Sequence, residues 1–423
     1  MSEYLSQLAK QYSPEHSRGI YSVCSAHPWV LEAALRHALD QEGPLLIEAT
    51  CNQVNQFGGY TGLTPRDFRR YVEAIAGQVG FPVERIILGG DHLGPHPWTH
   101  LGSDEAMQNA IEMVRLYVRE GFTKIHLDTS MACAGESSPL QDAVIAQRAT
   151  ELCLAAESVA GESKPVYVIG TEVPTPGGAT ETLTSVAVTT TESTELALAS
   201  HREAFLAAGL EVAWERVIAL VVQPGVEFGN DSVVDYEPEK ARHLSKFLQQ
   251  HPGIVFEAHS TDYQRAEAYR ELIQDGFAIL KVGPELTFAM RQALFALARI
   301  EEECVPPEER SYLPEVLERV MLHAPSQWQK HYHGNPCEQE YLRLHSYSDR
   351  IRYYWHYPEV QGAIRKLMDN LNRHTISESM LSDYLPEQYR KVRAGRLSKE
   401  PLPLVLDKIG EVLQGYSGAC VSH

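Results

Sequence analysis

The sequence predicts a (β/α)8 barrel, an α/β fold in which eight parallel strands close on themselves, followed by a helical C-terminal extension. Eight short runs of β-branched or apolar residues recur in the first 303 residues, and each ends in a cluster of Gly, Pro, His, Asp or Glu. A segment with helical periodicity follows each run. Eight such pairs over about 285 residues match the strand count and length of a closed barrel. A doubly wound open sheet is the alternative.

The predicted strands are Ile20–Cys24, Leu45–Ala49, Arg85–Gly89, Lys124–Leu127, Val166–Gly170, Val217–Val222, Ile254–Glu257 and Phe277–Lys281. The predicted helices between them include Pro65–Val79, Asp104–Arg119, Gln141–Val159, Thr194–Ala208 and Pro238–Gln250. Thr64 predicts one helix start, because a capping hydroxyl followed by Pro at the first helical position is typical there. Ser103, ahead of two acids, predicts another.

The pattern changes after Glu303. Val305-Pro306-Pro307-Glu308 ends the last barrel helix, and the remaining chain has helical periodicity without strand-like runs. We therefore expect two domains, the barrel over residues 1–303 and a helical extension over 304–423. The helical segments Leu313–His323, Val360–Asn372 and Pro403–Leu413 carry apolar faces that need a surface to cover, either the barrel or an oligomer interface.

Composition excludes several classes of partner. The 423 residues include 37 Lys+Arg and 56 Asp+Glu, so the net charge of −19 opposes binding to nucleic acid and to anionic membranes. Seven scattered cysteines without a C-x-x-C pair fit a reduced compartment. The N-terminus lacks the apolar run of a signal peptide, and no segment is long and apolar enough to span a bilayer. We expect a cytoplasmic protein.

Functional side chains of such a barrel lie where the strands end, at the carboxyl-terminal face. Seven of the eight predicted strands end there in acids, imidazoles, amides or an amine. The predicted catalytic residues are Asp91 and Glu48, the predicted metal ligands are His92, Glu172 and His259, and the predicted substrate-binding residues are Asn52, Gln53, Gly58, Gly59, Asp128, Gln223, Lys281 and Arg350.

Two imidazoles and one carboxylate, from His92, His259 and Glu172, form a ligand set that suits a divalent metal, zinc best of all. Asp91, beside His92, is then placed to carry a proton, and so is Glu48. The alternative is that these buried acids and histidines bond one another.

Three further features each have two interpretations. Lys281 is either a desolvated amine that forms a Schiff base or a lysine that pairs with acids or binds phosphate, and the many acids nearby favour the second interpretation. Gly58 and Gly59 either let backbone amides approach an anion or serve a tight turn. Arg350, within Ser348–Trp355, either reaches over the barrel mouth to a phosphate or a partner, or packs in a helix. The sequence has no P-loop motif.

The strand ends resemble the Z subunit family of D-tagatose-1,6-bisphosphate aldolase. The matching segments cover almost the whole chain: Ser22–Pro28, Ile47–Gly62, Ile86–Pro95, Lys124–Leu127 with Asp128, Ile169–Gly178, Val221–Phe228, Glu257–Tyr263 and Ser348–Trp355. The resemblance implies a barrel related to class II aldolases. It also implies a non-catalytic subunit, required for full activity and stability of the catalytic Y subunit in D-tagatose 6-phosphate degradation, within galactitol or N-acetylgalactosamine catabolism.

By the same resemblance, Asp91-His92 is similar to the Asp-His pair of catalytic class II aldolases, and His259 is similar to another zinc histidine. Gln223 stands where a third histidine is expected, and Ser260-Thr261-Asp262-Tyr263 replaces a glycine-serine phosphate loop. The resemblance implies metal-dependent 4-epimerase activity on fructose and tagatose for some relatives. Two classes therefore stay open: a stabilising subunit, and a metal-dependent epimerase or class II-type aldolase that takes a ketose or ketose phosphate. A homo-oligomer is compatible with both.

Overall fold

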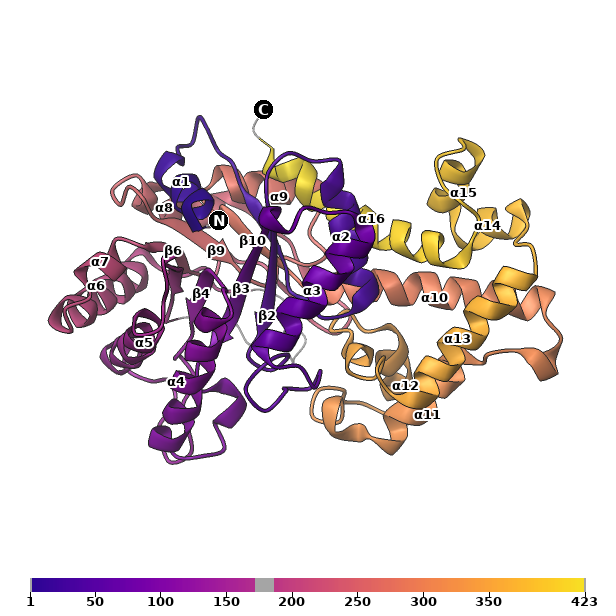
Figure 1. The fold of residues 1–423 in the computed structure, drawn as a ribbon, viewed down its shortest axis with the longest axis horizontal. Coiled ribbons are helices and arrows are strands. Elements are labelled where there is room, and N and C mark those ends of the chain that lie inside the picture. The colour runs from indigo at the N-terminus through magenta and orange to yellow at the C-terminus, as the bar shows by residue number, and fades with distance from the viewer. Residues whose placement is uncertain (1, 172–185, 422–423) are drawn as a thin grey trace.

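The computed structural model describes residues 2–171 and 186–421 and confirms the predicted barrel (Figure 1). Eight parallel strands close in the order β1-β10-β9-β6-β5-β4-β3-β2. Their bounds are β1 Ile20–Val23, β2 Leu45–Thr50, β3 Ile86–Leu93, β4 Lys124–Leu127, β5 Val166–Ile169, β6 Val217–Val221, β9 Val255–Ala258 and β10 Ile279–Val282. A short antiparallel pair, β7 Glu227–Phe228 and β8 Val233–Val234, lies in the segment after β6.

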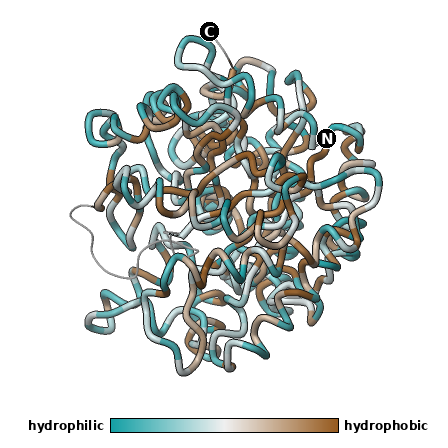
Figure 2. The backbone as a smooth tube through the Cα atoms, turned by 90° about the vertical axis from the view of Figure 1, so that its left-hand side faces the viewer, coloured by the Kyte–Doolittle hydropathy of each residue, from teal (hydrophilic) through white to brown (hydrophobic). Residues whose placement is uncertain are grey.

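Helices surround the strands, and apolar side chains fill the space between the two layers. Figure 2 shows the hydrophobic stretches gathered in the interior and the hydrophilic ones around the edge. The helices of this ring are α2 Pro28–Leu39, α3 Pro65–Val79, α4 Ser103–Arg119, α5 Asp142–Glu157, α6 Thr191–Ala207, α7 Glu211–Trp214, α8 Pro238–Leu248, α9 Ala266–Gln274 and α10 Pro284–Cys304. Helix α1 (Ser2–Gln11) packs Leu5 and Leu8 against a second apolar cluster of strand residues such as Leu46 and Ile87.

The two predicted helix caps differ in outcome. Thr64 caps α3 as expected, because its hydroxyl accepts the Asp67 N–H at 3.3 Å while Asp67 accepts the Thr64 N–H at 3.2 Å. The prediction for Ser103 is wrong. Gly102 holds the extended backbone of the cap position, and Ser103 is already helical, so its side chain does not bond the helix start.

The extension contains the expected helices and returns to the barrel. They are α11 Leu313–His323, α12 Pro336–His345, α13 Pro358–Arg373, α14 Glu378–Tyr384, α15 Pro386–Arg393 and α16 Pro401–Cys420. Helix α16 lies against the barrel ring (Figure 1). Its Tyr416 ring packs 4.0 Å from Tyr269 of α9, and its Ser417 hydroxyl lies 2.8 Å from His37 of α2. Barrel and extension thus share one apolar core, and a domain boundary at residue 304 stays a prediction.

The apolar faces of the extension are mostly internal. Val360, Leu367, Leu404 and Leu413 are buried in the shared core, whereas Leu322 is half exposed. No helix among the described residues has the length and hydropathy to cross a bilayer.

Candidate functional site

A cavity of about 360 Å³ opens where the carboxyl ends of the strands meet the extension. This volume lies in the range of small-molecule sites. Six of the predicted site residues line it, namely Asn52, Gln53, Asp91, His92, His259 and Lys281. The extension contributes Arg352, Tyr353, Trp355 and His356. The cavity is therefore shared between strand ends and extension.

A β-bulge at the end of β3 aims two consecutive side chains at this cavity. In a regular strand Asp91 and His92 would point to opposite faces. His92 instead has a φ of 50°, in the left-handed region, and the pairing of β3 with β4 shifts register between Gly90 and Leu93. Both side chains consequently line the cavity. Such backbone strain at a non-glycine residue is concentrated at functional sites.

The end of β3 also packs closely on the loop after β4. A Cβ on Gly94 would lie 1.6 Å from the carbonyl oxygen of Asp128, so only glycine permits this approach. Asp128 Oδ2 then lies 2.8 Å from His92 Nδ1 and orients the imidazole. The Nε2 atom of His92 is 3.7 Å from Asp91 Oδ2. A carboxylate on the far nitrogen is the usual support of a metal-binding histidine.

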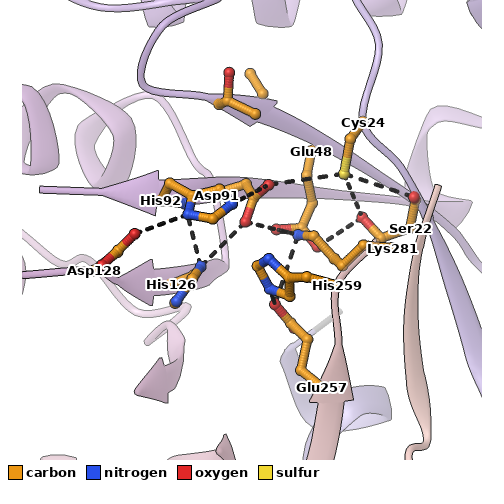
Figure 3. Close-up of polar contacts among 12 residues, drawn as sticks. Ser22, Cys24, Glu48, Asp91, His92, His126, Asp128, Glu257, His259 and Lys281 are labelled. Carbon is orange, nitrogen blue, oxygen red and sulfur yellow. Dashed lines mark hydrogen bonds and ion pairs between the residues drawn. The ribbon is translucent and has the colours of Figure 1, made fainter. Parts of the chain in front are cut away.

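Two lysines and two glutamates form a buried ion network next to the cavity, and Figure 3 shows its members Lys281, Glu48 and Glu257. Lys124 Nζ lies 2.8 Å from Glu48 Oε1 and 2.6 Å from Glu257 Oε2. Lys281 Nζ lies 2.9 Å from both Glu48 Oε2 and Asp91 Oδ1. Glu48 is fully buried and does not line the cavity, so its contacts hold Lys281 in place. Lys281 is thus a paired ammonium, the alternative that the sequence favoured.

Three imidazoles lie beside this network (Figure 3). The ring centroids of His92, His126 and His259 are between 4.8 and 5.2 Å apart. His126 Nδ1 lies 3.1 Å from Asp91 Oδ1 and 3.2 Å from the backbone N of His92. His259 Nε2 lies 2.9 Å from Glu257 Oε1. His126 Nε2 is buried without a hydrogen-bond partner among the described residues, which leaves one nitrogen for a ligand.

The neighbouring charges set the protonation of the cavity groups. Burial favours the neutral acid of Asp91, but His92, Lys281 and the hydrogen bond to His126 outweigh it and hold the pKa of Asp91 well below its usual range. Burial opposes the charge of Lys281, yet Asp91, Glu257 and Glu48 raise its pKa well above the usual value. Burial lowers the pKa of His259 to about 4. An ionised acid, an ammonium and a neutral imidazole therefore face one cavity.

The charge balance fits a divalent cation. Four carboxylates converge here with two ammonium groups: Glu48, Asp91, Asp128 and Glu257 with Lys124 and Lys281. With the imidazoles neutral, as metal binding requires, the excess is two negative charges; burial opposes the charged form of His92, but Asp91 and Asp128 outweigh it and raise the pKa of His92, which reduces this excess when His92 is protonated. Asp91, His126, Glu257 and His259 each offer a ligand atom, and these atoms all lie within 4.8 Å of one another. Two nitrogens and two carboxylate oxygens suit zinc. The chain therefore has residues that fit a metal.

Other predicted residues hold loops. Gln53 Oε1 accepts the Thr50 N–H at 2.9 Å, although the side chain also lines the cavity. Gly58 and Gly59 have φ of 96° and 54° and form a turn, and they are not among the residues lining the cavity. Gln223 Oε1 accepts the backbone N–H groups of Gly225 and Val226, so this side chain supports the turn after β6.

The remaining two predictions fall elsewhere. Glu172 lies outside the described residues. Arg350 does not line the cavity, because its guanidinium donates to the carbonyl of Gln327. Arg352, two residues on in the 3-10 helix η5 (Arg350–Tyr353), lines it instead.

Sequence analysis missed His126, Lys124 and Glu257. A signal was available: Lys124, His126 and Asp128 alternate with apolar residues along β4, and Glu257 and His259 do so along β9. Since alternate residues of a strand share a face, five polar side chains at this spacing indicate a polar barrel interior.

Fold and site together define a (β/α)8-barrel protein with an enzyme-like polar cavity at the carboxyl ends of its strands. The family described as D-tagatose-1,6-bisphosphate aldolase subunit GatZ/KbaZ-like matches residues 5–421. The chain belongs to this family, which confirms the resemblance.

The structure of a relative supports the fold, and two more distant structures are also similar. A Sinorhizobium meliloti 1021 protein, described as a probable tagatose 6 phosphate kinase, is 51% identical with a TM-score of 0.89, over 95% of this chain and 100% of that one. The fructose-bisphosphate aldolase of Campylobacter jejuni is 14% identical with a TM-score of 0.42, over 88% and 91% of the two chains. The YdjI aldolase of Escherichia coli K12 is 11% identical with a TM-score of 0.41, over 89% and 96%. The last two similarities are too low to inform the activity.

Proposed function

We propose that this chain is the non-catalytic subunit of a tagatose-bisphosphate aldolase. It associates in the cytoplasm with a catalytic class II aldolase Y subunit, which needs it for full activity and stability in D-tagatose 6-phosphate degradation. The observation that carries the proposal is the family match over residues 5–421.

Co-expression with the catalytic class II aldolase Y subunit tests this association. We expect one co-migrating complex in size-exclusion chromatography and a higher thermal midpoint for the aldolase, because binding only the folded state stabilises it. An unrelated (β/α)8 protein serves as the control. Independent migration with an unchanged midpoint would contradict the proposal.

A second function is favoured by the cavity itself: metal-dependent epimerisation at C4 of a ketose or ketose phosphate, or class II-type aldol chemistry. A purely stabilising subunit has no need for three imidazoles, an ionised acid and a lysine facing one cavity. His126 and His259 would offer nitrogen to the ion, and Asp91 and Glu257 would offer carboxylate oxygen. His92, whose ring centroid lies 4.8 Å from that of His259, is the further nitrogen donor. A bound divalent metal supplies the charge that polarises a ketose carbonyl.

Side chains that line the cavity would supply the remaining parts of the reaction. Asp91 lines the cavity and is ionised at neutral pH, so it is placed to accept the proton of the C4 hydroxyl as the C3–C4 bond breaks, and to return that proton when the bond re-forms on the opposite face of the aldehyde. Lys281, 2.9 Å from Asp91 Oδ1, holds that carboxylate in position. Asn52 and Gln53 line the same cavity and present amides to sugar hydroxyls.

Metal content per chain, measured after dialysis of the protein purified without its partner, tests this function. We expect a metal in the wild type, loss of it in His92→Ala and His259→Ala, and retention in Asp91→Asn with turnover of tagatose or fructose abolished. The matched control is His243→Ala, a histidine bonded to the Thr189 carbonyl away from the cluster. A metal-free wild type that still binds the aldolase would reject this function and leave the first one standing.

A further inference from the structure

One arginine of the extension, Arg352, lines the cavity and makes no direct ion pair among the described residues, although it interacts electrostatically with Asp262 and Asp349. The Arg352 guanidinium donates to the carbonyl oxygens of Ser348 and Asp349 and to the Tyr353 hydroxyl at 2.8 Å, and it lies 4.4 Å from the Tyr353 ring centroid. All of these acceptors are neutral. The Asp349 carboxylate pairs instead with Arg291, at 3.4 Å. Among the described residues, no carboxylate makes an ion pair with Arg352.

The other permanent cation of the cavity wall is different. Lys281 is surrounded by Glu48, Asp91 and Glu257, whose oxygens lie 2.9 to 3.6 Å from its Nζ. Its charge is therefore already compensated by the protein. Arg352, by contrast, is a cation of the cavity wall that no carboxylate of the described residues contacts directly, so its guanidinium can still pair with a ligand.

Two further hydrogen-bond donors line the same cavity. Trp355 is 2% exposed, and its indole Nε1 is buried without a partner among the described residues. The His27 ring meets the Trp355 ring edge to face, with centroids 6.4 Å apart. His27 Nδ1 accepts the Trp29 N–H at 3.3 Å, so the ring proton resides on Nε2. A charged donor and two neutral donors match an oxyanion, which only accepts.

The segment that carries Arg352 is fixed before any ligand arrives. The backbone N–H of Tyr347 donates to the Asn230 carbonyl at 2.8 Å, and the Asn230 side chain accepts from Ser346 and Ser348. Asp349 has a φ of 45° and accepts from Thr287 of α10 at 2.6 Å. The extension is thus hydrogen-bonded to the barrel at Asn230 and at Thr287 of α10, so Arg352 loses little conformational freedom on binding.

We propose that Arg352, Trp355 and His27 form an anion subsite that binds the phosphate or carboxylate group of a ketose, whose carbonyl end reaches Asp91 and His92. This subsite extends the proposed sugar chemistry. Only the position of the ketose carbonyl near Asp91 and His92 depends on that proposed function. The subsite makes the protein selective for anionic over neutral sugars. It also gives the extension a direct part in ligand binding.

Isothermal titration of the full chain tests the subsite with four probes: inorganic phosphate, fructose 6-phosphate, fructuronate and fructose. For Arg352→Gln we expect affinity for the anionic probes to fall by about tenfold or more, as charge-assisted hydrogen bonds are lost, with fructose binding unchanged. Trp355→Phe, which keeps the ring and removes one donor, lowers anion affinity less. Lys330→Gln, which removes an exposed positive charge of the same extension, is the control and leaves the affinities unchanged.

The titrations also identify the anion that the subsite binds. Tighter binding of fructose 6-phosphate than of fructuronate assigns the subsite to phosphate, and the reverse order assigns it to carboxylate. Anion affinities that survive in Arg352→Gln, or a wild type that binds no anion, would overturn the subsite. Should Arg352→Gln fail to fold, unchanged anion affinity in Trp355→Phe overturns it instead. Inorganic phosphate binding through Arg352 without binding of any ketose would reject the sugar chemistry alone.

Discussion

Replacing Lys124 with Met tests the buried ion network most directly. Lys124 is fully buried, and its Nζ lies 2.8 and 2.9 Å from the two oxygens of Glu48 and 2.6 Å from Glu257. The methionine fills a similar volume but leaves two carboxylates with less compensation. Removing one partner of a buried ion pair costs about 3–5 kcal/mol, because an unpaired charge stays in a dry interior. Lys281 still reaches Glu48, so Glu257 bears most of the loss.

Urea unfolding of Lys124→Met measures this cost as a lower midpoint with an unchanged slope. Adding Glu257→Gln to the same chain removes the carboxylate that Lys124→Met leaves unpaired. The double variant should therefore recover part of the lost unfolding free energy. The control is Arg36→Ala, which breaks the exposed 2.8 Å pair with Glu32 and should cost about 1 kcal/mol at most. A Lys124→Met protein as stable as the control variant, with no recovery in the double variant, would refute the ion network.

Three further predictions concern stability. Burial raises the pKa of Glu285 from 4.5 to about 8, so its contribution is fully present below pH 4.5 and is lost as pH rises through about 8. The urea midpoint should therefore fall across this range in the wild type and fall less in Glu285→Gln. Thr64→Ala should lose about 1 kcal/mol of unfolding free energy with the helix cap. Ser103→Ala, which removes no cap, should leave the urea midpoint unchanged. Gly94→Ala should unfold the protein or lower its thermal midpoint sharply, because the added Cβ meets a backbone oxygen at 1.6 Å. Gly77→Ala, in helix α3 with open space around it, should raise the midpoint, and a Gly94→Ala protein as stable as wild type would contradict the packing described here.

Much of the barrel could be predicted because its strands are short, apolar and buried on both faces. The segments Lys124–Leu127 and Leu313–His323 match an observed strand and helix residue for residue. Helix α16 was harder: Pro403–Leu413 showed its periodicity, but a helical pattern does not say which surface it covers. Its place in the barrel ring depends on contacts with residues almost 400 positions away, such as that between Ser417 and His37.

The kinds of functional group in the site could be predicted from the sequence, but not all of the residues that supply them. The strand-end rule found Asp91, His92 and His259, which the structure brings into one cavity. It could not foresee the bulge at His92, since nothing in the residue itself requires a left-handed backbone. The choice between Arg350 and Arg352 depends on the direction of one 3-10 turn, which the local sequence does not specify.

The return of helix α16 to the barrel bears on how the protein is made. The backbone N–H of Gly19, at the entry to β1, donates to the carbonyl of Cys420 at 3.3 Å, so the first strand is anchored by nearly the last residue of the chain. During synthesis every other strand and helix leaves the ribosome before this contact can form. Contacts of such long sequence separation slow folding. We expect the face of the barrel ring between α2 and α9 to stay uncovered until α16 has been synthesised, so a chaperone would bind there and a truncation before α16 would expose this face.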